Sequence, residues 1–211
     1  VAVGGDRAVV GDAPARAELP EDPSQQRESR VRGPLQDGRD VRVLRGGQGN
    51  DVVLYESAVI AVTVTLDGLA NDGTTGENDN VDADVEDLVG SRFGDSLTGN
   101  GAANHIQGGD GNDTIVTLAG ADEVDGGRGN DVIDAGAGID AINTGAGADR
   151  IRSRDTSSDD VACGADSDTV VANPGDLLRA CESPWFGATV RSSAARVRSG
   201  AVTLSLSCPA A

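Results

Sequence analysis

The chain has 211 residues and a net charge of −18, with 30 glycines, no methionine and only 2% aromatic residues. These proportions exclude an ordinary globular core, so apolar burial must come from thin stacks of Val, Ile and Leu. The negative charge argues against a nucleic-acid partner, and the lack of an apolar run of about 20 residues argues against a membrane span.

The acidic residues concentrate in residues 41–182, which carry 27 Asp and Glu against 8 Arg, a local balance of −19. Like charge at this density opposes folding unless something neutralises it. A solvated acidic surface would account for the sign of the charge. Bound divalent metal would also account for the regular spacing of the acids.

The chain divides into three parts by composition. Residues 1–34 are expected to form a linker or disordered arm. Residues 35–182 are expected to form one repeat domain with an insertion at about 55–87. Within the insertion, residues 58–66 are β-branched and predict a strand. The acid-rich stretch 67–84 is expected to be a solvated loop, with a further ion site as the alternative.

A nine-residue repeat runs from Gly90 to Arg152 in seven units without a gap, around the pattern Gly-Gly-x-Gly-x-Asp-x-aliphatic-x. The sixth positions are Asp95, Asn104, Asp113, Asp122, Asp131, Asp140 and Asp149. The eighth positions are Leu97, Ile106, Ile115, Val124, Ile133, Ile142 and Ile151. One carboxylate and one inward aliphatic side chain per unit indicate a stacked solenoid.

This pattern resembles the RTX (hemolysin-type) calcium-binding repeat. The units at Gly108 and Gly126 fit the full consensus, as does an isolated copy, GGQGNDVVL, at Gly46. The resemblance implies an all-β fold, a parallel β-roll in which two units make one coil of about eighteen residues. It also implies calcium ions held between stacked loops by the sixth-position Asp and by main-chain carbonyls.

Calcium suits such a gap because it takes six to eight oxygen ligands in a tolerant geometry. Zinc would require His or Cys ligands, and the chain has one His. Several calcium ions are therefore expected. The candidate metal-binding residues are Asp51, Asp95, Gly108, Asp110, Asp113, Asp122, Gly126, Asp131, Asp140 and Asp149.

The eighteen-residue coil sorts the loops onto two edges. Loops beginning at residues 90, 108, 126 and 144 share one edge and keep more of the consensus, so the tightest site is expected between Asp113 and Asp131. Loops beginning at residues 99, 117 and 135 share the other edge, where Asn104 replaces an anionic ligand and only Asp122 with Asp140 is expected to bind.

The last part of the chain departs from the period. The unit at residues 153–162 is one residue too long, after which the register resumes. Cys163 and Cys181 lie one coil apart, so we expect them to stack at disulfide distance. Residues 183–211 are expected to supply an end cap from Trp185 and Phe186, then a short β-hairpin that begins another module. The partner of Cys208 is expected in the part of that module beyond Ala211.

Two functions remain open. The first is an extracellular, non-catalytic calcium-binding β-roll that serves as a structural or adhesive segment of a larger secreted or surface protein, whose cell-surface or matrix ligand the sequence does not name. The second is the C-terminal repeat region of a secreted hydrolase of the protease or lipase type. The chain has no His-Glu-x-x-His and no Gly-x-Ser-x-Gly motif, so the second would need a catalytic domain before Val1. No enzyme activity is expected within this chain.

Overall fold

The computed structural model describes residues 30–32, 43–181, 195–196 and 202–207, and every regular element in them is a β-strand. The strands form two sheets. The first sheet contains, in spatial order, β1 (Arg30–Arg32), β3 (Val52–Leu54), β7 (Asp87–Val89), β9 (His105–Asp110), β11 (Glu123–Arg128), β13 (Ala141–Asn143), β15 (Asp160–Ala162), β17 (Leu177–Arg179) and β18 (Ala195–Arg196). The second contains β19 (Val202–Ser207), β16 (Ser167–Ala172), β14 (Arg150–Arg152), β12 (Val132–Asp134), β10 (Thr114–Val116), β8 (Ser96–Thr98), β4 (Val62–Thr65), β5 (Ala70–Thr74), β6 (Asp79–Val81) and β2 (Val43–Leu44).

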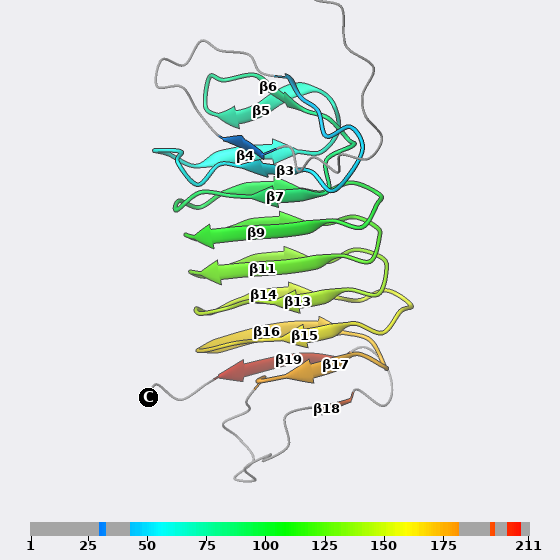
Figure 1. The fold of residues 1–211 in the computed structure, drawn as a ribbon. Coiled ribbons are helices and arrows are strands. Elements are labelled where there is room, and N and C mark those ends of the chain that lie inside the picture. Colours follow the sequence, from blue (N-terminus) through cyan, green and yellow to red (C-terminus); the bar gives the residue numbers. More distant parts are fainter. Residues whose placement is uncertain (1–29, 33–42, 182–194, 197–201, 208–211) are drawn as a thin grey trace, which may run out of the picture.

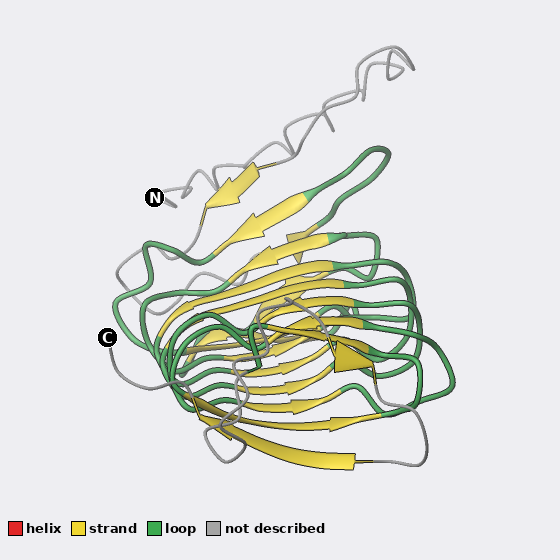
Figure 2. Ribbon diagram, turned by 90° about the horizontal axis from the view of Figure 1, so that it is seen from below, coloured by secondary structure: helices red, strands yellow, loops and turns green. Residues whose placement is uncertain are grey.

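From β7 to β17, consecutive strands alternate between the two sheets, so two strands make one coil (Figure 1). Each strand pairs in parallel with the strand one coil away: Ile115 lies beside Leu97 on one side and Ile133 on the other, each eighteen residues distant. Viewed from below, the stacked coils outline two sheets joined by loops at both edges (Figure 2). The predicted parallel β-roll is confirmed.

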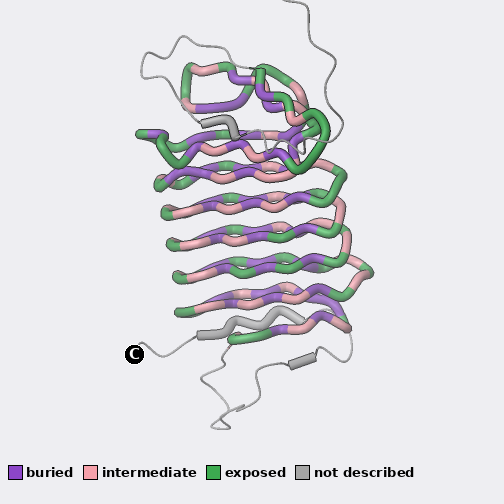
Figure 3. Tube along the Cα trace, viewed as in Figure 1, coloured by how far each residue is buried: buried purple, intermediate pink, exposed green. Residues whose placement is uncertain are grey.

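The core is a double column of aliphatic side chains between the sheets. Most strands are only three residues long, and alternation turns the middle residue inward while its neighbours face outward. The inward residues of the coils are Leu88, Leu97, Ile106, Ile115, Val124, Ile133, Ile142, Ile151, Val161, Val170 and Leu178, all at most 3% exposed. Figure 3 shows this alternation of buried and exposed positions along every coil. Burying one such side chain stabilises the fold by roughly 1.5–3 kcal/mol.

The eighteen-residue spacing is broken in two places near the C-terminal end: the long unit at residues 153–162 adds one residue, as predicted, and the next coil is one residue short. Ile142 pairs with Val161 and Ile151 with Val170, a spacing of 19 residues instead of eighteen. The next pair, Val161 with Leu178, is only 17 residues apart. The extra residue is therefore absorbed in a loop, and the aliphatic column continues without a break.

The insertion is more ordered than the expected loop. β4 covers only part of the predicted strand at 58–66, β5 pairs with it antiparallel, and β6 pairs with β5 and with β2. Asp72 and Asp79 are 1% and 3% exposed. Asp72 accepts hydrogen bonds from the main-chain N–H groups of Thr65 (2.7 Å) and Val81 (2.8 Å). The expectation of a solvated loop is wrong for these two acids, because Asp72 accepts main-chain hydrogen bonds inside a small sheet and Asp79 accepts one from the Tyr55 hydroxyl group at 3.4 Å.

The two C-terminal strands correct another expectation. β18 pairs antiparallel with β17 in the first sheet, and β19 pairs antiparallel with β16 in the second. They therefore do not form the predicted hairpin with each other. The last coil leaves an unpaired edge on each sheet, and each edge hydrogen-bonds one of these strands. Trp185, Phe186 and Cys208 lie outside the described residues.

Cys163 and Cys181 are joined by a disulfide, with their Cα atoms 5.0 Å apart. This is the pairing that their one-coil spacing predicts. The disulfide joins the chain just after β17 to the chain just after β15, one coil earlier. No helix among the described residues is long and apolar enough to cross a membrane.

Candidate metal centre

A buried polar side chain stands two residues before every inward aliphatic residue of the roll except Leu88, which half-buried Glu86 precedes. Because the strands alternate between sheets, these side chains form two columns, one along each edge. The first-edge column contains Asp95, Asp113, Asp131 and Asp149, which precede strands of the second sheet, and Asp168, which lies within β16. The second-edge column, which precedes strands of the first sheet, contains Asp51, Asn104, Asp122, Asp140, Asp159 and Asp176. All are at most 3% exposed.

The carboxylates are linked along each column by main-chain hydrogen bonds. The N–H of Asp113 donates to Oδ1 of Asp131 at 2.8 Å, and the N–H of Asp131 donates to Oδ1 of Asp149 at 2.8 Å. On the second edge the N–H of Asp122 donates to Oδ1 of Asp140 at 3.0 Å. Each bond fixes one carboxylate oxygen and leaves the other inside the loop.

That second oxygen has no hydrogen-bond partner in several of the aspartates. Oδ2 is buried and unpaired in Asp113, Asp131, Asp140 and Asp168. A buried carboxylate oxygen without a donor costs free energy unless a cation meets it. These oxygens are therefore candidate cation ligands.

Glycine at the first position leaves the space beside this oxygen open. A Cβ atom placed on Gly126 would lie 2.7 Å from Oδ2 of Asp131 and 2.5 Å from the main-chain oxygen of Thr144 in the next coil. The same crowding applies at Gly108, between Asp113 and the main-chain oxygen of Gly126. Only glycine lets a carboxylate oxygen and a carbonyl oxygen approach each other this closely in the gap between coils.

Burial shifts the titration of these acids. Burial above all, with smaller contributions from the nearby charges of Asp131 and Asp95, raises the pKa of Asp113 from 3.8 to about 7. Burial, with a smaller effect from Asp149, raises the pKa of Asp131 to about 6. The pKa of Asp140 is raised to about 6 by burial and by Asp122. The ionised column is therefore destabilising at neutral pH, and a bound divalent cation would remove that cost.

The chemistry of the gap fits a hard cation. Within the described part of the chain, no three His, Cys, Asp or Glu side chains converge as a metal-binding group. A cation in a gap must therefore draw most of its ligands from main-chain carbonyls, with one carboxylate per loop. Calcium accepts such mixed oxygen shells, whereas zinc sites use imidazole and thiolate ligands.

Four copies of the RTX calcium-binding nonapeptide repeat match the chain, within residues 43–56, 89–124 and 116–151. These repeats belong to the RTX calcium-binding family. They form a calcium-binding β-roll segment. No curated protein matches the chain.

In two RTX units that depart from the pattern, the oxygen that would face a cation accepts a hydrogen bond instead. Ser91 stands at the second position of its unit, and its N–H donates to Oδ2 of Asp95 at 2.5 Å. In the next unit Asn104 turns its Oδ1 to the N–H of Asn100 at 2.8 Å and donates through Nδ2 to the carbonyl of Glu86 at 3.2 Å. Neither side chain presents a free carboxylate oxygen to the gap.

The expected ligand Asp110 lies apart from the columns. It ends β9 with an exposed side chain that pairs with Arg128 at 3.8 Å. Asp110 therefore forms an ion pair with Arg128 on the outer surface of the roll.

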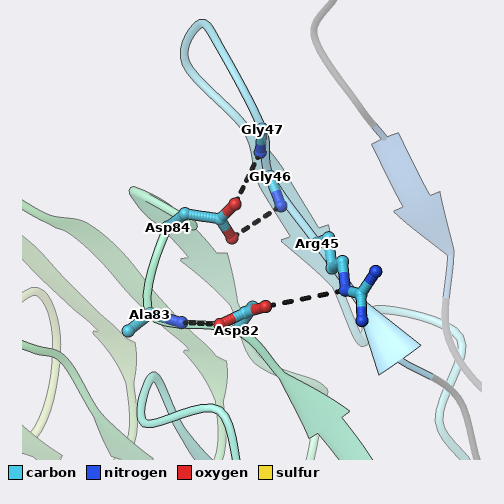
Figure 4. A network of polar contacts seen from close by, with 6 residues as sticks. All are labelled: Arg45, Gly46, Gly47, Asp82, Ala83 and Asp84. Atoms are coloured by element: carbon cyan, nitrogen blue, oxygen red, sulfur yellow. Dashed lines mark hydrogen bonds and ion pairs between the residues drawn. The ribbon is translucent and has the colours of Figure 1, made fainter.

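The isolated RTX copy at Gly46 begins next to the insertion (Figure 4). The N–H groups of Gly46 and Gly47 donate to the two carboxylate oxygens of Asp84 at 2.9 and 2.8 Å. Asp51, the sixth residue of this copy, is 1% exposed, and its N–H donates to Oε2 of Glu86 at 2.9 Å. The insertion thus supplies the acids that stack on this first loop.

Three buried aspartates of the columns were not among the expected ligands. Asp159 accepts the N–H of Asp140 at 3.0 Å, Asp168 accepts the N–H of Asp149 at 3.0 Å, and Asp176 accepts the N–H of Asp159 at 3.2 Å. Because the spacing after Arg152 is irregular, no single nine-residue count reaches all three. Counting back two residues from each inward aliphatic side chain finds all three.

Proposed function

We propose that this chain is an extracellular calcium-binding β-roll that serves as a structural or adhesive segment of a larger secreted or surface protein. The observation that carries the proposal is the unpaired Oδ2 of Asp113 and of Asp131, each facing a glycine and a carbonyl oxygen of the next coil. Calcium would bind in these two gaps, 108/126 and 126/144, and would join adjacent coils through oxygens that otherwise repel each other.

The second edge would bind calcium more weakly. Asp140 has an unpaired Oδ2 there, but its unit begins with Ala135 instead of glycine, and Asn104 supplies no carboxylate. The calcium sites would therefore be unequal, with the tightest ones on the first edge.

Two features support an extracellular setting. The Cys163–Cys181 disulfide is of a kind that persists in oxidising compartments. The acidic segment also needs cations to neutralise its charge. Calcium is abundant outside the cell, where modules with weak calcium sites are filled. A roll whose stiffness depends on external calcium suits a spacer or adhesive segment.

The test is calcium stoichiometry by isothermal titration calorimetry on the full chain. Asp131→Ala should bind fewer ions than the wild type, because the gap that follows Gly126 loses the carboxylate oxygen that faces it. Asn104→Ala is the matched control and should keep the wild-type number, since Asn104 supplies no charge. Equal losses from both variants, or no calcium bound by the wild type, would overturn the assignment.

A further inference from the structure

Two threonines occupy positions where the best repeats have glycine. Thr117 and Thr144 are the first residues of their units, and both are fully buried. The equivalent residues in the consensus units are Gly108 and Gly126. A polar side chain has therefore been placed inside two of the loops.

Each threonine hydroxyl bridges its own coil to the next. Oγ1 of Thr117 donates to the main-chain oxygen of Ala135 at 2.6 Å, and Oγ1 of Thr144 donates to the main-chain oxygen of Cys163. Each hydroxyl also lies beside the aspartate of its own unit, Asp122 or Asp149. Oδ2 of both aspartates is buried and makes no hydrogen bond of good geometry.

The space that the hydroxyl occupies is the space that glycine leaves open elsewhere. Beside Gly126, a carboxylate oxygen and the carbonyl oxygen of the next coil face each other with no donor between them. Beside Thr144, a hydroxyl group stands between the corresponding pair of oxygens. This hydroxyl group donates a hydrogen bond to the carbonyl oxygen, and the threonine side chain fills the gap.

We propose that Thr117 and Thr144 close their gaps with a hydroxyl group in place of a calcium ion. The gaps 117/135 and 144/163 then hold together without metal, and calcium is confined to gaps that begin with glycine or lack a hydroxyl. This inference rests on the proposed function and refines it. For Asp122 and Asp149 it replaces the role of calcium ligand that the sequence suggested.

The C-terminal coils extend the same arrangement. The first positions of three consecutive units are Thr144, Ser153 and Cys163. The hydroxyl of Ser153 donates to Oδ2 of Asp176 at 3.1 Å, and Cys163 forms the disulfide. Each of these side chains links neighbouring coils without a metal ion. This end of the roll is therefore built to stay together when calcium is absent.

The test is the substitution Thr144→Gly, which turns TGAGADRI into the full consensus GGAGADRI. In calcium chloride titrations of the full chain, this variant should bind one more ion than the wild type. Thr144→Val keeps the bulk but removes the proton donor. It should bind the wild-type number and unfold at lower urea in chelator. Thr144→Ser keeps the hydroxyl and should match the wild type in both measurements.

A second variant covers the case in which Thr144→Gly does not fold. Thr117→Gly opens the other gap, and the next residue, Leu118, already has the positive φ of 75° that this loop position requires. It should also gain one ion. Unchanged stoichiometry in both glycine variants, with calcium still bound by the wild type, would overturn this inference alone. A wild type that binds no calcium would instead overturn the proposed function.

Discussion

Asp131→Asn should stabilise the calcium-free protein and weaken its response to calcium. Asp131 is 1% exposed; its Oδ1 accepts a main-chain hydrogen bond from Asp113, and its Oδ2 is unpaired. Asparagine keeps an oxygen for the hydrogen bond and removes the charge. The substitution therefore separates the cost of the buried charge from its use as a metal ligand.

The magnitude follows from the titration of this side chain. Burial raises its pKa from 3.8 to about 6, so the ionised form is disfavoured in the folded state. A shift of about 2 units corresponds to roughly 3 kcal/mol of folding free energy at pH 7.5, which the neutral amide should recover. In calcium, each filled site adds about 2.7 kcal/mol when the ion is at 100 times its dissociation constant. Calcium should therefore stabilise the Asp131→Asn variant by about 2.7 kcal/mol less than it stabilises the wild type.

The assay is urea denaturation followed by circular dichroism at pH 7.5, in chelator and in calcium. Asp134→Asn is the matched control, because that carboxylate is only half-buried and pairs with Arg152 at 3.2 Å on the surface. Its effect should stay below about 1 kcal/mol in both buffers. An Asp131→Asn variant that is less stable than the wild type in chelator, or gains as much from calcium, would refute the reasoning.

Three further predictions concern pH, the disulfide and the core. The pKa values of the column aspartates in the folded protein are about 6 to 7, above the ordinary 3.8. The stability of the calcium-free protein should therefore fall as pH rises from about 4 to 7, while the calcium affinity measured by calorimetry rises. Slopes of the opposite sign would contradict this. Reducing Cys163–Cys181, which closes a loop of 18 residues, should cost roughly 3 kcal/mol and raise hydrogen exchange first in the C-terminal coils; uniform loosening would count against it. Ile133→Ala should lower the free energy of unfolding, measured in urea, by about 2–5 kcal/mol. Val132→Ala, at an exposed position, should lower it far less. Similar losses in the two variants would show that Ile133 is not a core residue.

The periodic part of the fold could be predicted because one rule fixes it. In each unit from Gly90 to Arg152, the eighth residue must turn inward and the sixth must lie in the loop just before the strand, so Ile115 and Asp113 find their places from spacing alone. Parallel stacking then follows, because identical units bury their aliphatic residues best on each other. The same spacing predicts the disulfide between Cys163 and Cys181.

The rest depends on contacts that no period encodes. The pairing of β2 with β6 joins residues 43–44 to residues 80–81. Buried Asp72 accepts main-chain hydrogen bonds from both Thr65 and Val81 in the same small sheet. The hydroxyl bridge of Thr144 depends on the exact fit of one side chain between two coils. In such places a contact other than the repeating one joins the coils. These contacts can be recognised only when the position of the neighbouring coil is known.

The most direct test of a calcium-binding roll is calcium titration of the full chain, followed by far-ultraviolet circular dichroism and urea denaturation. Millimolar calcium should raise the β-sheet signal and the urea midpoint, because ions join coils whose buried carboxylates otherwise repel each other. Magnesium at the same concentration should do much less, since it holds its water and demands a stricter geometry. Spectra and midpoints that stay the same between chelator and millimolar calcium would contradict the account.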